Sequence, residues 1–239
     1  MPMAAPEPPA CVVWCWRGAA TPDAAGAVLT AAERDRARQH RRAVDRAGSA
    51  TAAGLLRLAV ADHLTSRPGR LRQTARELVV DRTCARCGGQ HGKPDVGVRG
   101  LHVSVAHSGI DDTSVVVVAI TTAGPVGVDA EMITDRDFAP LASLVLAPKE
   151  AARPPRTPRD WFATWCRKEA VLKATGDGLR TPMSEVALTG RSDAPGIASY
   201  SGRPLDCDLQ DLDLGDDIAA AVAVLGPRTP VSVRVVELS

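Results

Sequence analysis

The chain has 239 residues, enough for one large domain or two small ones with a sizeable core. Its formal net charge of +1 argues against a protein that coats nucleic acid or carries an acidic tail. It contains no run of about 20 apolar residues, so no membrane span is expected.

The N-terminus and the cysteines favour the cytoplasm. Residues 1–10, MPMAAPEPPA, lack the charged and apolar regions of a signal peptide. Six cysteines are spread irregularly over a chain that is large enough to be stable without disulfide bonds. We predict that all six are reduced: Cys11, Cys15, Cys84, Cys87, Cys166 and Cys207. We therefore expect a cytoplasmic protein whose partners are neither nucleic acid nor membrane.

The N-terminal part predicts a strand followed by basic helices. Residues 11–16 are typical of a strand, and Thr30 with Glu33 forms a capping box at the start of a helix. Residues 52–64 predict a buried helix. The window between carries six arginines, which fit either a solvated face or an anion clamp: Arg34, Arg36, Arg38, Arg41, Arg42 and Arg46.

A C-x-x-C pair follows a short predicted strand at residues 78–80. Cys84, Cys87 and the nearby His91 have the spacing of metal ligands, and Cys11 or Cys15 could complete a tetrahedral zinc site. A second C-x-x-C pair is missing, so a plain loop is the alternative.

Two further short motifs come next. Gly92-Lys93-Pro94 combines a stiff backbone with a cation, although an ordinary surface turn has the same composition. Residues 101–105 predict a strand with His107 at its end, where side chains commonly face a cleft.

The most β-like run is residues 113–121, and a Gly-Pro turn leads from it into residues 126–131. We expect this hairpin at the centre of a sheet, with Asp129 and Glu131 on one face because strand side chains alternate. Residues 185–188, 218–225 and 231–236 are predicted to be strands that close a second sheet.

A helix is predicted from Pro158 to Thr175, capped by Thr157 and ended by Gly176. It places Trp165, Glu169 and Lys173 on one face. With Asp129 and Glu131, Glu169 would complete three carboxylates that suit a hard cation holding phosphates. Ordinary surface ion pairs are the alternative.

These motifs resemble a known family. G-V-D-A-E at 127–131 and W-C-R-K-E-A-V-L-K at 165–173 are similar to the strand and helix motifs of 4'-phosphopantetheinyl transferases of the surfactin-synthetase-activating (Sfp) type. The upstream Gly92-Lys93-Pro94 and His107-Ser108 match the same family in the same order. One departure is Ala106, where the family usually has a serine.

The resemblance implies an α+β fold of two similar α/β halves related by pseudo-twofold symmetry, with coenzyme A in the cleft between them. The halves would be residues 1–122, with contacts to the 3'-phosphate and adenine, and residues 123–239, with the metal site. Members of this length tend to be monomeric, so a monomer is expected.

The resemblance also implies the activity of a holo-[acyl-carrier-protein] synthase. Such an enzyme moves the phosphopantetheine arm of coenzyme A onto a serine of an acyl or peptidyl carrier protein and releases adenosine 3',5'-bisphosphate. Carriers of polyketide, nonribosomal-peptide and antibiotic synthesis are expected by the same analogy.

Site residues follow from the matched motifs. Asp129, Glu131 and Glu169 would hold Mg²⁺, with Mn²⁺ as an alternative. Lys173 would stabilise the leaving phosphate, and Glu169 would take the serine proton directly or through a water. Contacts to coenzyme A are expected from Lys168, Lys173, Lys93, Pro94, His107, Arg38 and Arg46, with Arg36 as a competitor for the 3'-phosphate.

Two other classes stay open. A catalytically silent module that binds coenzyme A or a carrier protein would not need all three acids. A zinc-stabilised regulatory protein built on Cys84, Cys87 and His91 would unfold on chelation.

Overall fold

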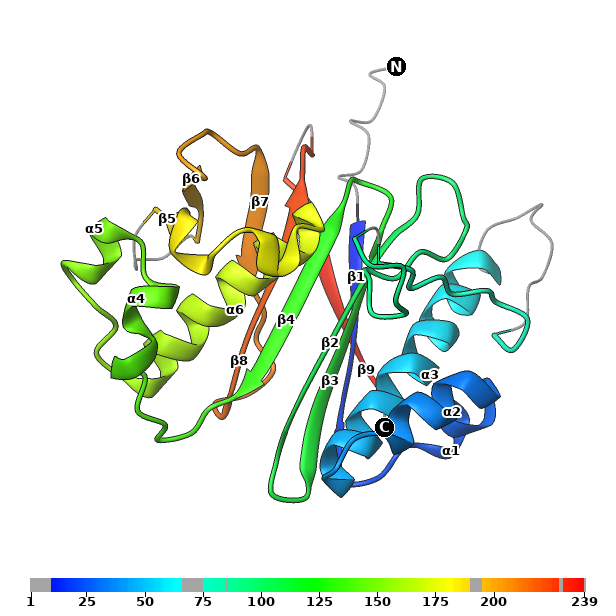
Figure 1. The fold of residues 1–239 in the computed structure, drawn as a ribbon. Helices are drawn as coiled ribbons and strands as arrows, with labels where there is room; N and C mark the ends of the chain where they lie inside the picture. Colours follow the sequence, from blue (N-terminus) through cyan, green and yellow to red (C-terminus); the bar gives the residue numbers. More distant parts are fainter. Residues whose placement is uncertain (1–9, 66–74, 85, 190–194, 228–229, 239) are drawn as a thin grey trace, which may run out of the picture.

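The fold is a stack of four layers in which two sheets lie between two long helices (Figure 1). The computed structural model describes residues 10–65, 75–84, 86–189, 195–227 and 230–238. This mixed α+β content with several sheets agrees with the predicted fold class.

The first sheet has the order β2-β3-β1-β9. Its strands are β1 (Ala10–Gly18), β2 (His102–Ile110), β3 (Thr113–Thr121) and β9 (Ser232–Glu237). β3 pairs antiparallel with both β1 and β2, whereas β9 runs parallel to β1. Because layers cover both faces of β3, its side chains from 114 to 121 are all buried and its sequence is almost continuously apolar.

The second sheet has the order β4-β8-β7, and a separate pair joins β5 to β6. The strands are β4 (Val126–Met132), β5 (Val186–Leu188), β6 (Ile197–Tyr200), β7 (Cys207–Asp211) and β8 (Ile218–Leu225).

Helices cover the outer faces of the two sheets. The N-terminal group is α1 (Asp23–Ala27), α2 (Ala31–Arg38) and α3 (Ala43–Thr65); the later group is η1 (Ala139–Leu141), α4 (Ala142–Val145), α5 (Pro148–Ala151), α6 (Pro158–Thr175), η2 (Gly178–Arg180) and η3 (Met183–Glu185). The capping boxes predicted for α2 and α6 are both present. No helix within the described ranges is long and apolar enough to cross a membrane.

Three apolar clusters hold the layers together. The middle one joins the inner faces of the two sheets, for example Val117 of β3 with Val128 of β4. The second packs α3 against the outer face of the first sheet, and the third packs α6 against the outer face of the second. All six cysteines are free, as predicted.

Five local expectations are wrong. β3 and β4 belong to different sheets and do not form a hairpin. β9 pairs with β1, and β5 pairs with β6, instead of closing the second sheet. Residues 78–80 are not a strand, since only the Asp81–Asp95 bridge forms in that region of the described chain. His107 lies inside β2, which continues to Ile110. The division at 122 stays a prediction, but the last strand crosses back to the first sheet.

A buried ion pair fixes α2 to α3. Arg57 is 3% exposed and Glu33 9%, and Arg57 Nε lies 2.9 Å from Glu33 Oε2. Arg57 Nη1 also donates to the carbonyls of Ala75 and Leu78. Burial raises the pKa of Glu33, but hydrogen bonds from Arg57 and Thr30 outweigh burial, so its pKa is lowered.

Replacing Arg57 should destabilise the protein strongly. Arg57→Met leaves Glu33 buried without its cation, which typically costs about 3–5 kcal/mol. Arg38→Met is the matched control, because the Arg38–Asp35 pair is exposed and such pairs contribute about 0–1 kcal/mol. Urea unfolding at neutral pH measures both, and equal losses would contradict the assignment.

The same ion pair makes the stability of the protein depend on pH in the acid range. Since the pKa of Glu33 is lower in the folded state, the unfolded chain binds more protons in the acid range. The stability that Glu33 contributes should therefore fall as pH falls from its unfolded value of about 4.3 through its folded value. Arg57→Met should flatten that part of the stability curve.

Candidate functional site

The predicted strand and helix motifs meet because a glycine lets α6 touch β4. A Cβ atom at Gly127 would lie 1.8 Å from the carbonyl oxygen of Ala170 and 2.4 Å from the nitrogen of Ala174, so no other residue fits without a shift. Figure 1 shows α6 lying along β4 on the outer face of the second sheet. Asp129 and Lys173 are consequently held side by side.

Asp129 and Lys173 form an ion pair at the centre of the site. Lys173 Nζ lies 2.6 Å from Asp129 Oδ1 and donates to the carbonyl of Val128 at 3.1 Å. Burial by itself lowers the pKa of Lys173, but Asp129 and Glu169 outweigh it and the pKa is raised. Lys173 is therefore a stable cation in this site.

Glu131 and Glu169 are both affected by the negative charge of Asp129. Ser108 Oγ donates to Glu131 Oε2 at 2.5 Å. Burial, Asp129 and Glu169 raise the pKa of Glu131 to about 7, and burial and Asp129 raise the pKa of Glu169. Acids whose pKa is raised by a neighbouring carboxylate favour a cation between them.

The donor set fits a hard divalent cation. Asp129 Oδ2 is buried and has no hydrogen-bond partner by geometry among the described residues, although the Cys166 thiol interacts with this carboxylate. Carboxylate oxygens without sulfur or imidazole suit Mg²⁺ or Mn²⁺. In this conformation Asp129, Glu131 and Glu169 do not bring three ligand atoms within 4.8 Å of one another, and Lys173 is paired with Asp129 instead.

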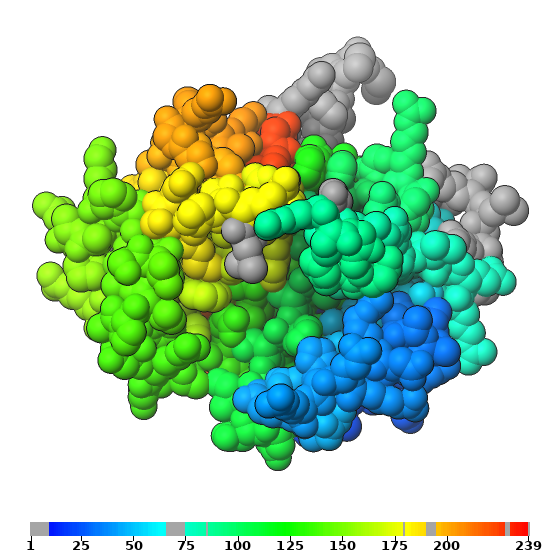
Figure 2. Space-filling model, in the orientation of Figure 1, coloured from blue at the N-terminus to red at the C-terminus, as the bar shows by residue number. Residues whose placement is uncertain are grey.

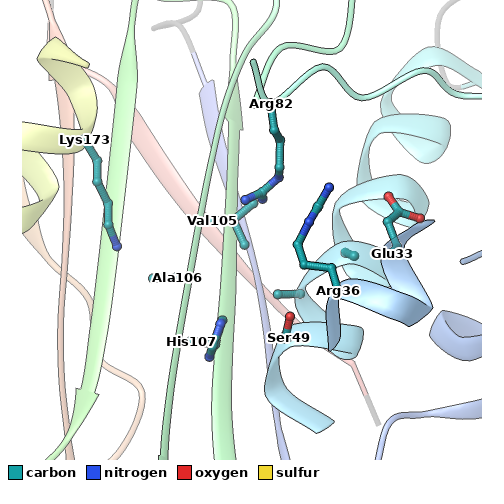
Figure 3. A pocket seen from close by; sticks show the side chains of 10 residues that line it. Glu33, Arg36, Ser49, Arg82, Val105, Ala106, His107 and Lys173 are labelled. Carbon is teal, nitrogen blue, oxygen red and sulfur yellow. The ribbon is translucent and has the colours of Figure 1, made fainter. Parts of the chain in front are cut away.

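A cationic cavity of about 260 Å³ adjoins these acids. Arg36, Arg82, His107 and Lys173 line it, together with Ser49 of α3 and the buried Glu33 (Figure 3). In Figure 2 the green strands form the floor between the blue and cyan helices and the yellow-green α6. Neither guanidinium has a hydrogen bond or ion pair with another described residue, so both are available to an anion.

The arginines in the cavity differ from those favoured by the sequence. Arg38 is exposed and pairs with Asp35 at 2.8 Å, and Arg46 donates to the carbonyls of His40 and Arg41. Arg36, the competitor, does line the cavity. Arg82 was missed because it lies among other arginines, such as Arg76 and Arg86, and in no recognised motif; its place just before the C-x-x-C pair was the available signal.

β2 serves both parts of the site because its side chains alternate. Ser104 and Ser108 face β4, where Val128 N donates to Ser104 Oγ at 3.0 Å. His107 faces α3, and Gly48 allows it to approach that helix closely. Burial, followed by His40 and Lys173, lowers the pKa of His107. Both of these serines are thus engaged in hydrogen bonds, while Ser49 offers a hydroxyl inside the cavity.

Lys93 and Pro94 lie in a neighbouring hollow beside the end of α6. Lys93 Nζ donates to the carbonyl of Ala174 at 2.9 Å, and burial of the ammonium lowers its pKa to about 8. The Gly92-Lys93-Pro94 loop therefore contacts the end of α6. It does not line the cavity that holds Arg36 and Arg82.

Lys168 lies away from the acid cluster and the cavity, in contrast to the prediction that it contacts coenzyme A. Its side chain is fully buried, and Nζ lies 2.5 Å from Glu150 Oε2, 2.7 Å from the carbonyl of Val145 and 3.2 Å from that of Met183. Burial lowers its pKa, while Glu150 opposes that effect. Lys168 therefore ties α6 to α4, α5 and η3, and the expected phosphate contact has no support in its placement.

A known family model matches the part of the chain that contains the strand and helix motifs. Residues 125–223 match the family model described as ACPS, the 4'-phosphopantetheinyl transferase superfamily. The match spans β4 to β8, including Asp129, Glu131, Glu169 and Lys173, and covers less than half of the chain. No curated protein matches the chain. The superfamily resemblance is thus confirmed for this region, and the finer type stays a prediction.

Lys168→Met separates a structural lysine from a phosphate contact. It leaves Glu150 without its cation and two carbonyls without their donor, so we expect a loss of about 3–5 kcal/mol in unfolding free energy. In the folded fraction, affinity for coenzyme A should stay within twofold. Normal stability with much weaker binding would instead restore the phosphate contact.

Proposed function

We propose that the protein is a 4'-phosphopantetheinyl transferase of the Sfp type, which moves the arm of coenzyme A onto a serine of an acyl or peptidyl carrier protein. The observation that carries the proposal is the double role of Lys173. It pairs with the acid cluster through Asp129 and also lines the cationic cavity, so a ligand with several phosphates can span both. The superfamily match over residues 125–223 suggests the same chemistry.

Coenzyme A carries its charge in two places. The 3'-phosphate fits the cavity, where Arg36, Arg82 and His107 offer forked and ring donors. The pyrophosphate fits beside Lys173 and the acids. Lys93 and Pro94, in the adjoining hollow, would contact the adenine end of coenzyme A.

The reaction is a displacement at the β-phosphorus, with adenosine 3',5'-bisphosphate as leaving group. Asp129, Glu131 and Glu169 would hold Mg²⁺ or Mn²⁺, which when bound neutralises charge on the pyrophosphate. Lys173 contacts the phosphate that leaves and stabilises its growing charge, since its raised pKa keeps it protonated. Glu169, which lies one turn from Lys173 on α6, takes the serine proton directly or through a water.

The carrier protein would approach the open side of the acids. Carrier helices that present acidic side chains would find exposed basic residues at Lys149 and Arg156, which line a large hollow beside α5 and α6. We assign the carriers to polyketide and nonribosomal-peptide synthesis by resemblance, and the enzyme to the cytoplasm as a monomer.

A silent module that binds coenzyme A or a carrier is the second candidate. Ala106 supports it, since a hydroxyl expected beside His107 is missing. Such a module would bind coenzyme A but would not need Asp129, whose buried Oδ2 has no hydrogen-bond partner by geometry among the described residues.

Intact-mass spectrometry of an apo carrier protein tests the proposal. Incubation with the enzyme, coenzyme A and Mg²⁺ should add one phosphopantetheine arm, and EDTA should abolish the gain. Asp129→Asn and Glu169→Gln should lower the rate by roughly 10²–10³-fold, as loss of charge-stabilising groups does. Arg234→Gln, at an exposed position on β9, is the control for a charge outside the site. Binding of coenzyme A without transfer to any of several carriers would favour the silent module.

The cavity makes a separate prediction for coenzyme A. Arg36→Ala and Arg82→Ala should each raise KM for coenzyme A by roughly 10–100-fold, because charge-assisted hydrogen bonds contribute about 1.5–3 kcal/mol. Neither change should affect 3'-dephospho-coenzyme A. Arg38→Ala is the matched control and should leave both values unchanged. A larger effect of Arg38→Ala than of Arg82→Ala would return the 3'-phosphate to the exposed arginines.

A further inference from the structure

Residues 81–84 and 86–95 belong to a closed hairpin whose flanks carry Arg82 and Lys93. At its base Asp81 and Asp95 exchange backbone hydrogen bonds of 2.8 Å, and Gly92 N donates to the carbonyl of Arg82 at 2.6 Å. Nearer the tip, Cys84 N donates to the carbonyl of Gly89 and Gly88 N to the carbonyl of Cys84. The backbone is therefore folded tightly around Cys84 and Cys87.

Three soft ligands converge at the tip of this hairpin. The Sγ atoms of Cys84 and Cys87 and a ring nitrogen of His91 lie within 4.8 Å of one another, and no other set of three described side chains meets this limit. Cys87 Sγ lies 3.0 Å from His91 Nε2. Two thiols and an imidazole are the donors that Zn²⁺ prefers.

The backbone also prepares the sulfurs for a metal. Gly89 N donates to Cys87 Sγ at 3.4 Å, and the backbone N–H groups of Arg86 and Cys87 hydrogen-bond Cys84. Gly88 has a left-handed φ of 71°, and a Cβ at Gly89 would lie 3.0 Å from the ring of His91. Both glycines are thus required for the close approach of the three ligands.

We propose that Cys84, Cys87 and His91 bind one zinc ion, which would hold the tip of the hairpin closed. Binding releases the two thiol protons to solvent and leaves the fourth position to water, since Cys87 and His91 are exposed. From bond lengths of about 2.3 Å for Zn–S and 2.1 Å for Zn–N, Cys87 Sγ and His91 Nε2 need to separate only to about 3.6 Å.

The other cysteines cannot complete this site. Cys11 and Cys15 lie on β1 inside the core between the two sheets, and burial raises the pKa of these thiols to about 12 and about 11. The zinc would instead clamp the hairpin whose flanks carry Arg82 and Lys93, and so fix both at the mouth of the cavities they line.

Metal analysis of the full chain tests the proposal. Protein purified without chelator should hold one zinc per chain, and Cys87→Ser and His91→Ala should each lose most of it. Cys207→Ser and Glu131→Gln are controls for a thiol outside the hairpin and for the acid cluster, and both should keep the ion. Unchanged zinc in Cys87→Ser, or equal loss in Glu131→Gln, would overturn the site.

The unmodified protein provides a second test in case the variants misfold. After chelation, Co²⁺ should produce a thiolate-to-metal charge-transfer band, and bound metal should protect Cys84 and Cys87 from alkylation. Chelation should also expose the peptide bond after Arg86 to trypsin. A Co²⁺ complex without the thiolate band, or alkylation of both thiols at the same rate with and without zinc, would contradict the proposal.

Discussion

The close contact of α6 with β4 is the constraint on which the site depends. The missing side chain at Gly127 lets the backbone of α6 rest on the strand at Ala170 and Ala174. One turn of helix then aligns Glu169 and Lys173, and two residues of strand align Asp129 and Glu131. A larger residue at 127 would push α6 outward and separate Lys173 from Asp129 before it affected the rest of the core.

Charge is arranged around this contact in two opposite groups that share one lysine. Burial and neighbouring carboxylates raise the pKa of Glu131 and of Glu169, while Arg36 and Arg82 have no ion pair with another described residue. Either group by itself would be unfavourable in a ligand-free protein. A ligand that brings phosphates to the arginines and a cation to the acids would relieve both, and this is the physical basis of the proposed function.

The sequence predicted the elements better than their pairing. β3 and β8 appeared at their observed bounds, and the capping boxes of α2 and α6 formed, because these signals are local. The separation of β3 from β4 and the return of β9 to β1 depend on sheet packing that no short window records. Likewise the shared faces of Asp129 with Glu131 and of Glu169 with Lys173 follow from periodicity. The burial of Lys168 and the approach of Arg82 to the cavity depend on long-range packing that no short window records.

Calorimetric binding of two ligands tests the central claim, that one ligand spans both charge groups. Adenosine 3',5'-bisphosphate lacks the pyrophosphate, so its affinity should fall in Arg82→Ala but stay unchanged in Glu169→Gln and without Mg²⁺. Coenzyme A should respond to all three changes. The account of a shared site would be wrong if Glu169→Gln and Arg82→Ala weakened binding of the bisphosphate equally. It would also be wrong if the affinity for coenzyme A did not change in one of these two variants.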